Sequence, residues 1–529
     1  MRNTLTTLFF FFFISFNLMA QEKTFLSVKA IDSLTNEPIS FATIRINNTN
    51  RGLIADEEGS FRLPLELQIQ KDSLIISAIG YNTKSVNLKT FDNTILNIIK
   101  VASKVEVLQT VTITKNITKE GGLGFITAEQ IISNAIKNIK INYPKDPFSY
   151  LAYYRDYQVF ENEYFNLNEG LIEVFDAGFK TNSFLNKENK TALYSYRLNK
   201  GFPQNLGFSI PYDNKRSKYI EDAYIPSIGG NELSILQMHD PIRNYEMKNL
   251  AFIYNWETDF IKNHDFELIG TTFLNDKPIY EIKIKKKASN STSVNTRFLY
   301  VKGNNKFDDY FKVEGVIYIS KGNFAIHKIE YAVYDEEAKT SKYAINLEYV
   351  PKNNLMYLNY LSFNNAFKVK DKESFETTSF SLTTSQDLVS LRVNNLISVS
   401  TLKKKNFKVY HGKTELPIES IGWVEGAEIQ IKINLKKDTF KRYKIDNESA
   451  ITIVTKNVLD TSNRKLDEPL FLDINQFREV FVQEVFPNKQ PIPGLEYSMK
   501  SQPLSQGPLN KNDAISKYWL NTPLKKTKD

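Results

Sequence analysis

Residues 25–46, FLSVKAIDSLTNEPISFATIRI, hold two short segments in which apolar and polar side chains alternate. The first covers residues 25–30 and the second residues 41–46, and this period of two is typical of a half-buried β-strand. The residues between them, 32–38, include Asp, Asn and Pro, which favour turns. We therefore predict a small sheet that carries Ile44 on its buried face.

The same succession of short strands and turns continues to residue 88. Residues 47–52 and 56–59 carry Asn and Gly, which tolerate the positive φ angles of tight turns. Residues 74–81 form an apolar segment that ends in Gly80-Tyr81 and is typical of a buried strand. Strands at such close spacing predict a small β-sandwich.

A set of turn and strand residues recurs in a fixed order through this region. Its members are Asp32, Thr35-Asn36-Glu37-Pro38-Ile39, Ala42-Thr43-Ile44, Gly52, Asp56-Glu57-Glu58-Gly59-Ser60-Phe61 and Ser77-Ala78-Ile79-Gly80-Tyr81. This order resembles that of the carboxypeptidase regulatory-like domain, a transthyretin-like β-sandwich. Ser27 is a departure, because many members carry Gly there, but it affects a strand edge and not the fold. The resemblance implies a non-catalytic module of the kind that precedes many envelope proteins of bacteria with two membranes.

The first 20 residues predict where the protein works. Arg2 precedes an apolar run over residues 5–18, and Ala20 ends this segment before Gln21. A positive start, an apolar middle and a small residue at the end are typical of a cleaved secretory signal peptide. The run is too short to span a bilayer. We expect an exported protein, in the periplasm or associated with the outer membrane, with no transmembrane helix in the mature chain.

The composition excludes several kinds of chemistry. The 529 residues include no Cys and only four His, so disulfides, thiolate zinc sites, iron–sulfur clusters and cysteine nucleophiles are ruled out. The net charge of +8 includes Lys runs that are scattered along the chain, as at residues 283–287 and 403–405. Nucleic-acid binding needs a compact basic stripe with aromatic platforms. We therefore expect no nucleic-acid partner.

One clear helix is predicted to begin at Thr127 and to end at residues 142–144. Thr127 and Gln130 have the spacing of a capping box, and apolar residues at helical spacing follow from Ile131. The preceding residues, 104–126, contain a glycine cluster that lacks the spacing of a phosphate-binding loop and predicts a hinge.

Strands resume at residue 148 and predict a large, mostly antiparallel β region. Residues 275–278 and 321–323 have the composition of hairpin turns. The aromatic-rich strands over residues 266–363 loosely resemble the curved half-barrel of periplasmic lipoprotein-carrier proteins, which implies an apolar concave face for acyl chains. The fold class is therefore mainly β, with an N-terminal transthyretin-like β-sandwich, a short junction helix and a β region for which a half-barrel is one candidate form.

The end of the chain is predicted to be a helix followed by an extended tail. Residues 475–486 place Phe and Val at helical spacing. The Pro-rich residues that follow are expected to be laid on the domain by Tyr497, Tyr518 and Trp519. The predicted division of the whole chain is: signal peptide 1–20, regulatory-like sandwich 21–103, linker 104–126, helix with antiparallel β domain 127–400, further β segment 401–486 and Pro-rich extended tail 487–529.

Three acidic residues raise the question of a glycosidase-like pair. Glu169 and Glu173 share one face of a predicted strand at about 13 Å, which is too far apart for that chemistry, and Asp176 follows them. We interpret them as solvated acids or as acids paired across strands.

His264 and Glu267 form a His-x-x-Glu spacing, which is the zinc half-site of metallocarboxypeptidases. His411 or His327 would be the third ligand. The segment alternates like a strand, however, and residues three apart on a strand point to opposite faces. A zinc hydrolase is therefore the weakest alternative.

We assign no catalytic, cofactor-binding or metal-binding residue, and we expect no enzyme activity and no cofactor. The main hypothesis is a non-catalytic envelope protein that acts as a structural or interaction module at the periplasmic face of the outer membrane. Its partner would be an envelope protein, a lipid or a glycan. The alternative hypothesis is a half-barrel carrier that binds lipids or acyl chains.

Overall fold

The computed structural model describes the chain in two compact units, residues 1–367 with 475–529 and residues 368–474. The predicted signal peptide, residues 1–20, and most of the predicted linker lie outside the described residues. The residues that the structure describes are 25–47, 49–70, 72–104, 126–183, 185–208, 218–220, 223–225, 231–246, 256, 260–287, 311–335, 341–370, 374–424, 427–434, 451–468 and 471–524.

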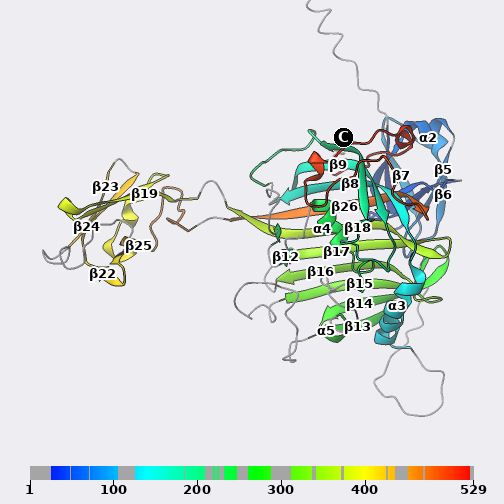
Figure 1. Ribbon diagram of the computed structural model, residues 1–529, viewed down its shortest axis with the longest axis horizontal. Coiled ribbons are helices and arrows are strands. Elements are labelled where there is room, and N and C mark those ends of the chain that lie inside the picture. The colour runs from blue at the N-terminus through cyan, green and yellow to red at the C-terminus, as the bar shows by residue number, and fades with distance from the viewer. Residues whose placement is uncertain are drawn as a thin grey trace, which may run out of the picture. The chain divides into compact units, whose positions relative to one another are not determined.

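The first unit begins with the predicted β-sandwich (Figure 1). One sheet has the order β4-β1-β7 and the other the order β3-β2-β5-β6. Side chains from both sheets form one core, in which Val28, Ile44 and Phe61 are buried. The elements are β1 (Phe25–Asp32), β2 (Thr43–Ile46), β3 (Gly52–Ile54), β4 (Ser60–Pro64), α2 (Leu65–Ile69), β5 (Ser73–Ser77), β6 (Lys84–Asn87) and β7 (Leu96–Val101).

The turn before β4 is held by Asp56. Its Oδ1 accepts the backbone N–H groups of Glu58 at 3.0 Å and Ser60 at 2.8 Å. Gly59 has a φ of +69°, and a Cβ there would lie 2.5 Å from the carbonyl oxygen of Ala30. Only glycine fits this position, as the sequence pattern indicated.

The rest of the first unit is built on a ten-stranded sheet of order β10-β9-β8-β26-β18-β17-β16-β15-β14-β13 (Figure 1). The strand pairings resolved within it are antiparallel, which confirms the predicted large antiparallel region. Its strands are β8 (Phe148–Phe160), β9 (Glu163–Asp176), β10 (Lys190–Leu198), β13 (His264–Leu274), β14 (Lys277–Lys286), β15 (Phe311–Ser320), β16 (Ile326–Asp335), β17 (Ser341–Lys352), β18 (Leu355–Lys370) and β26 (Phe471–Pro487). A separate hairpin pairs β11 (Lys218–Ile220) with β12 (Ala223–Ile225).

Two helices cover one face of this sheet, which we call the helix face. They are α3 (Ala128–Asn142) and α4 (Glu232–Met238); the short α5 (Ile261–Asn263) precedes β13. Thr127 and Gln130 form the predicted capping box of α3, with the Thr127 Oγ1 accepting the Gln130 N–H at 3.2 Å. Ile131 and Ile139 of α3 pack into the same core as the inward side chains of the strands.

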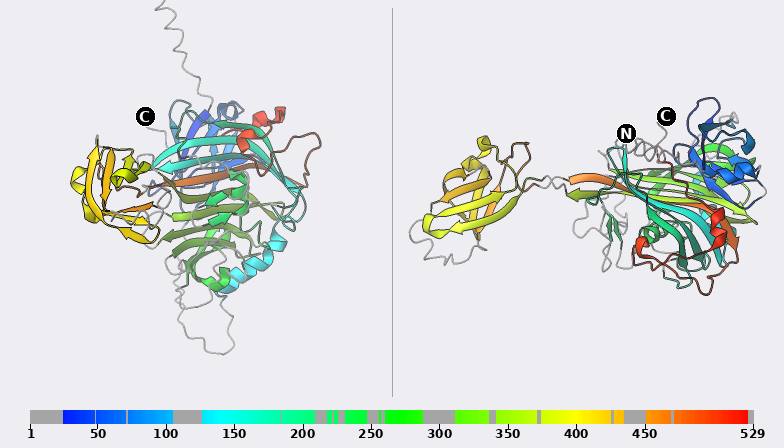
Figure 2. Two further views of the ribbon diagram at one scale, coloured as in Figure 1. Left: turned by 60° about the vertical axis from the view of Figure 1, so that its left-hand side comes forward. Right: turned by 90° about the horizontal axis from the view of Figure 1, so that it is seen from above.

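The N-terminal sandwich covers the opposite face, which we call the outer face. Phe41 and Ile54 pack against Tyr153, Tyr360 and Phe481 of the central strands. Figure 2 shows the sandwich (blue) on one side of the large sheet. The central strands are therefore buried on both sides.

Residues 488–524 bind the sandwich to the sheet. Trp519 is only 4% exposed and packs in the core of the sandwich, and its Nε1 donates to the Arg62 carbonyl oxygen at 2.9 Å. The N–H groups of Ser498 and Asn510 donate to the Thr191 and Leu193 carbonyl oxygens of β10 at 2.9 and 2.8 Å. The tail thus completes one hydrophobic core and also covers an edge strand.

The prediction of a helix at residues 475–486 is wrong, because these residues belong to β26. Val480 and Val482 face the helix side, whereas Phe477 and Phe481 face the sandwich. A strand buried on both faces is a continuous apolar run, and such a run matches a helical pattern as well as a strand pattern. The predicted further β segment, residues 401–486, also differs in its bounds from the compact unit, which covers residues 368–474.

The second unit is a smaller β domain with its own core. Its two sheets have the orders β19-β20-β24-β23 and β22-β21-β25, and side chains such as Phe375, Val409 and Ile431 form one cluster. Its strands are β19 (Thr377–Thr383), β20 (Leu388–Val393), β21 (Phe407–His411), β22 (Thr414–Leu416), β23 (Ile418–Val424), β24 (Glu428–Ile433) and β25 (Ile451–Thr455).

Replacing Trp519 by alanine tests the role of the tail. We expect Trp519→Ala to lower the free energy of unfolding of the first unit by about 3–5 kcal/mol, because it empties part of the sandwich core. Urea denaturation followed by tyrosine fluorescence measures this change. Met499→Ala is the matched control, since that side chain is 55% exposed in the same tail and should change stability by less than about 0.5 kcal/mol. Equal effects of the two substitutions would contradict the packing described.

Candidate functional site

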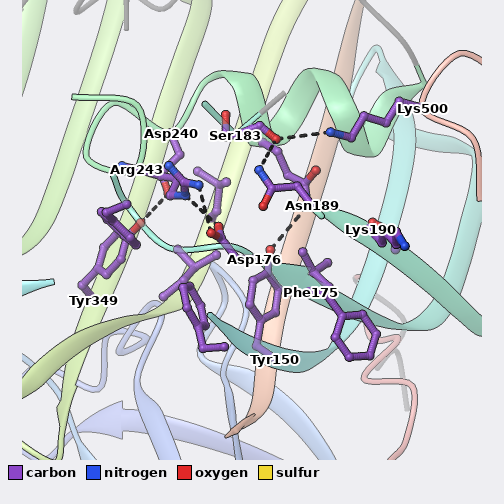
Figure 3. Close-up of a pocket in the computed structure, with 17 residues that line it drawn as sticks. Tyr150, Phe175, Asp176, Ser183, Asn189, Lys190, Asp240, Arg243, Tyr349 and Lys500 are labelled. Atoms are coloured by element: carbon purple, nitrogen blue, oxygen red, sulfur yellow. Dashed lines mark hydrogen bonds and ion pairs between the residues drawn. The ribbon is translucent and has the colours of Figure 1, made fainter. Parts of the chain in front are cut away.

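A cavity of about 50 Å³ lies beside α4, where the segment after this helix meets β8 and β9 (Figure 3). Asp176, Asp240, Arg243, Tyr349 and Lys500 are among its lining residues. Charged groups in a concave site on the helix face make it the first place to look for chemistry.

All three nitrogen atoms of the Arg243 guanidinium donate hydrogen bonds within this cluster. Its Nε and Nη2 donate to the two oxygens of Asp176 at 2.7 and 2.9 Å, and Nη1 donates to the Thr181 carbonyl oxygen at 2.8 Å. Asp240 accepts the Tyr349 hydroxyl at 2.6 Å, and its burial raises the pKa of its carboxyl to about 6. These contacts attach the segment after α4 to β9 and β17.

Lys500 reaches the same cavity from the tail. Its Nζ donates to the Ser183 carbonyl oxygen at 3.2 Å, and burial lowers the pKa of this amine to about 8. A lysine of lowered pKa is a potential nucleophile, but 50 Å³ holds only about two water molecules. The cluster therefore serves as a clamp between the tail, α4 and the sheet.

A second buried ion pair holds α4 itself. Arg478 of β26 pairs with Glu232 at the start of α4, and its Nη1 donates to the Asn365 Oδ1 at 2.8 Å. This pair joins β26 to α4 and to β18.

A larger cavity of about 190 Å³ lies between the sandwich and the outer face, and we call it the junction chamber. Its floor is formed by five neighbouring strands, β9, β8, β26, β18 and β17, and its roof by the turn that follows β3. The lining residues are Phe41, Asp56, Glu57, Glu58, Arg155, Tyr157, Tyr164, Ala344, Asn346, Tyr360, Ser362, Asn364, Phe477, Glu479 and Leu524.

An ion pair lies in the floor of the junction chamber. The Arg155 Nε donates to Glu479 at 2.5 Å, and the Tyr360 hydroxyl donates to the other oxygen of Glu479 at 2.6 Å. Arg155 is 1% exposed. Three other buried atoms of the lining, Arg155 Nη1, Asn346 Oδ1 and Asn364 Oδ1, have no hydrogen-bond partner among the described residues.

The roof carries a carboxyl group with a perturbed pKa. Burial raises the pKa of Asp56 to about 7, against the opposing influence of the Arg155 charge. Near neutral pH this carboxyl is therefore present in both protonated and ionised forms, whereas an exposed aspartate is ionised.

His264 and Glu267 do not converge. His264 is buried, with its Nδ1 at 2.8 Å from the Phe260 carbonyl oxygen and its Nε2 at 2.6 Å from the Tyr331 hydroxyl. The Glu267 side chain is 65% exposed and pairs with Lys285 at 3.8 Å. The strand alternation thus separates them as predicted, and burial lowers the pKa of His264 to about 4.

The other residues of the zinc alternative lie elsewhere in the fold. His327 is buried on β16, and burial lowers its pKa to about 4. His411 belongs to β21 of the second unit. Within the described ranges, no group of three or more His, Asp or Glu side chains is placed to hold a metal ion.

Glu169 and Glu173 are paired across strands and are not solvated. Glu169 accepts hydrogen bonds from Arg197 at 2.7 Å and from the Thr522 hydroxyl at 2.7 Å. Glu173 accepts from the Ser149 hydroxyl and from Lys489, both at 2.6 Å. These acids hold the tail on the outer face.

Residues 29–113 match the family model of the CarboxypepD_reg-like domain. The chain therefore contains this domain, as the sequence predicted. A search of curated proteins found no match. Over the described residues, no helix combines the length and apolar character that crossing a membrane requires.

Solved structures show only distant similarity. A LolA superfamily protein from Nitrosomonas europaea is 10% identical, with 60% of this chain and 97% of that chain covered and a TM-score of 0.18. A DUF1329 family protein from Desulfovibrio piger is 8% identical, with 45% and 85% covered and a TM-score of 0.18. MucB, solved in complex with MucA, is 6% identical, with 62% and 99% covered and a TM-score of 0.14. Similarities of this size carry no conclusion about ligand or partner.

The buried pair of Asp176 and Arg243 should matter much more than an exposed pair nearby. We expect Asp176→Ala to cost about 3–5 kcal/mol in the free energy of unfolding, because it leaves the Arg243 charge buried and unpaired. Asp146→Ala is the control, since its pair with Lys180 spans 3.9 Å between exposed side chains and should contribute under about 1 kcal/mol. Urea denaturation at pH 7 measures both. A small loss for Asp176→Ala would show that the clamp is not structural.

Asp56 gives a prediction for the dependence of stability on pH. Between its unfolded pKa of 3.8 and its folded pKa of about 7, the folded chain keeps a proton that the unfolded chain has released. Stability contributed by this group is therefore complete below pH 4 and is lost as the pH rises to 7.

Asp56→Asn keeps an oxygen acceptor for the turn and removes the charge. Relative to this variant, the native chain should lose on the order of 3 kcal/mol between pH 4 and pH 8. Urea denaturation of both proteins across this range measures the difference. Parallel curves for the two proteins would contradict the assignment.

Proposed function

We propose that this chain is a non-catalytic, exported interaction protein of the bacterial cell envelope, and that residues 368–474 carry the surface that contacts its partner. The first unit, which we call the platform, is connected to this inserted domain through β18 and β26. The observation that carries the proposal is the insertion of a separately packed β domain between two strands that are neighbours in the large sheet.

The insertion contributes little to the platform. β18 precedes it and β26 follows it, and these two strands lie side by side in the sheet. A short connection between them would therefore be enough to build the sheet. The inserted residues instead form their own hydrophobic core. A separately packed domain that the connectivity of the sheet does not require is a good candidate for a binding module.

The inserted domain exposes apolar side chains at one strand end. Trp423 is 50% exposed and Val424 41% exposed at the end of β23. Among the described strands, β23 is one of the two edge strands of its sheet, and an edge strand offers backbone groups with which another chain can pair. Tryptophan is enriched among the residues that dominate binding energy at interfaces.

Support for a non-catalytic role comes from the state of the charged residues in the first unit. Asp176, Arg243, Glu169 and Glu173 are engaged in buried or partly buried hydrogen bonds that hold secondary-structure elements together. His264 and Glu267 face different surroundings. A reactive centre would need at least two such groups to converge on a substrate.

The carrier hypothesis finds less support in the geometry. An acyl carrier needs an open apolar volume on the helix face. In the described part of the chain, α3 and α4 pack into the core on that face, and the cavity beside α4 measures about 50 Å³. We therefore favour the interaction protein.

Photo-crosslinking in cells tests the proposed surface. A photoreactive amino acid placed at Trp423 in the full chain should form a discrete crosslinked adduct with an envelope component. The matched control is the same amino acid at Leu206, an 88% exposed apolar position in the first unit, which should give little adduct.

Substitution provides the second readout. Trp423→Ser should reduce crosslinking from a photoreactive amino acid at Val424 at least fivefold, and it should leave the thermal unfolding of the chain unchanged. Equal crosslinking from Trp423 and Leu206, or no adduct from either, would reject residues 368–474 as the interaction module.

A further inference from the structure

The junction chamber differs from a second polar cavity that lies between the sandwich and the sheet. That neighbouring cavity measures about 220 Å³, and its polar groups satisfy one another: the Thr43 hydroxyl donates to Glu348 at 2.8 Å, and the Asn359 amide donates to Glu348 at 2.9 Å. In the junction chamber, by contrast, Arg155 Nη1, Asn346 Oδ1 and Asn364 Oδ1 are buried without a partner among the described residues.

Buried polar atoms without partners cost free energy and need a reason. An unmade hydrogen bond on a buried group costs about 1–3 kcal/mol, so three of them in one chamber are a considerable cost to the folded chain. A ligand or ordered water that pairs with all three would remove this cost.

The three atoms define which ligand fits. Arg155 Nη1 is a donor, and the two asparagine oxygens are acceptors, so the ligand must both accept and donate hydrogen bonds. A hydroxyl group does both. It also pairs with an asparagine amide in either orientation of the amide group.

The charges of the chamber disfavour ions. Arg155 is already neutralised by Glu479, which leaves no net positive charge for an anion. The roof adds the acidic residues Asp56, Glu57 and Glu58, which repel anions further. A cation would be attracted to the roof and could contact the asparagine oxygens. It would leave the Arg155 Nη1 donor without a partner, because a cation accepts no hydrogen bond.

The floor offers flat apolar surface beside these polar groups. Tyr157 and Phe477 are cross-strand neighbours whose rings stack at 5.1 Å with an angle of 2°, and Tyr360 lies on the next strand. Aromatic walls combined with a few directed polar groups are typical of small-molecule sites. A volume of 190 Å³ holds about six water molecules, which is room for a ligand with a single ring.

We propose that the junction chamber binds a neutral, polyhydroxylated ring, that is, one sugar unit, with Arg155 Nη1 donating to it and Asn346 and Asn364 accepting from it. The sugar is either free or the end of an envelope glycan, and the two share the same chemistry. The site is independent of the proposed interaction surface on residues 368–474.

Titration of the full chain with sugars tests this site. The probes are glucose, galactose and N-acetylglucosamine, short oligosaccharides that end in these units, and the charged analogues glucuronate and glucosamine. Isothermal titration calorimetry and saturation-transfer NMR should detect binding of at least one neutral probe and weaker binding of the charged analogue of the same ring. Binding of the free unit indicates a free sugar as ligand, whereas binding of the oligosaccharide alone indicates a glycan end.

Two substitutions distinguish a ligand-binding role from a structural one. Asn346→Leu and Asn364→Leu should weaken sugar binding about fivefold or more, because each removes one acceptor. In the sugar-free chain both should leave thermal stability unchanged or raise it, because each replaces an amide whose buried oxygen is unpaired with an apolar group of similar size. Asn359→Leu is the comparator for stability on the same strand as Asn364; it breaks hydrogen bonds to Glu348 and should destabilise the chain.

Three results would overturn the proposal. The first is that no neutral sugar binds to the full chain. The second is that a sugar binds equally well to the native chain and to both asparagine variants, which would place the site elsewhere. The third is that a charged analogue binds more tightly than its neutral parent, which would exclude the proposed class of ligand.

Discussion

Burial of both faces of the central strands is the constraint on which the rest of this structure depends. On β8, Tyr150 and Tyr154 pack with the helices, whereas Leu151 and Tyr153 pack with the sandwich side. An antiparallel sheet can leave one face to water, but this one cannot, because its apolar residues point both ways. The regulatory-like domain is therefore a structural layer of the fold and not an appendage on a linker.

Burial of both faces of the sheet also explains why its charged side chains occur in pairs. A charge brought between two layers must be paired, since an isolated buried charge is costly. Arg155 of β8 and Arg478 of β26 lie on adjacent strands and serve opposite faces of the sheet: Arg155 pairs with Glu479 of β26, and Arg478 pairs with Glu232 of α4. Each nitrogen of the Arg243 guanidinium is paired, whereas three buried polar atoms of the junction chamber have no hydrogen-bond partner among the described residues. This difference separates a structural cluster from a candidate binding site.

Local features of the fold could be predicted from the sequence, and non-local ones could not. The capping box of Thr127 and the turn at Gly59 depend on residues within a few positions of each other, and both are present. The strand β26 was misassigned because its partner β8 lies more than 300 residues earlier in the chain. Likewise, Asn346 and Asn364 are polar residues in strands of alternating apolar and polar side chains. The sandwich covers them in the folded chain, and no local sequence pattern predicts this contact.

The place of Trp519 in the sandwich core has a consequence for biosynthesis. A ribosome releases residues 25–101 early, but the indole that fills their interior is added more than 400 residues later. Until then the nascent domain has an unfilled centre and lacks its final stability. A polypeptide that stops before Trp519 should therefore have a less stable sandwich, and one more open to proteases, than a chain that includes this residue.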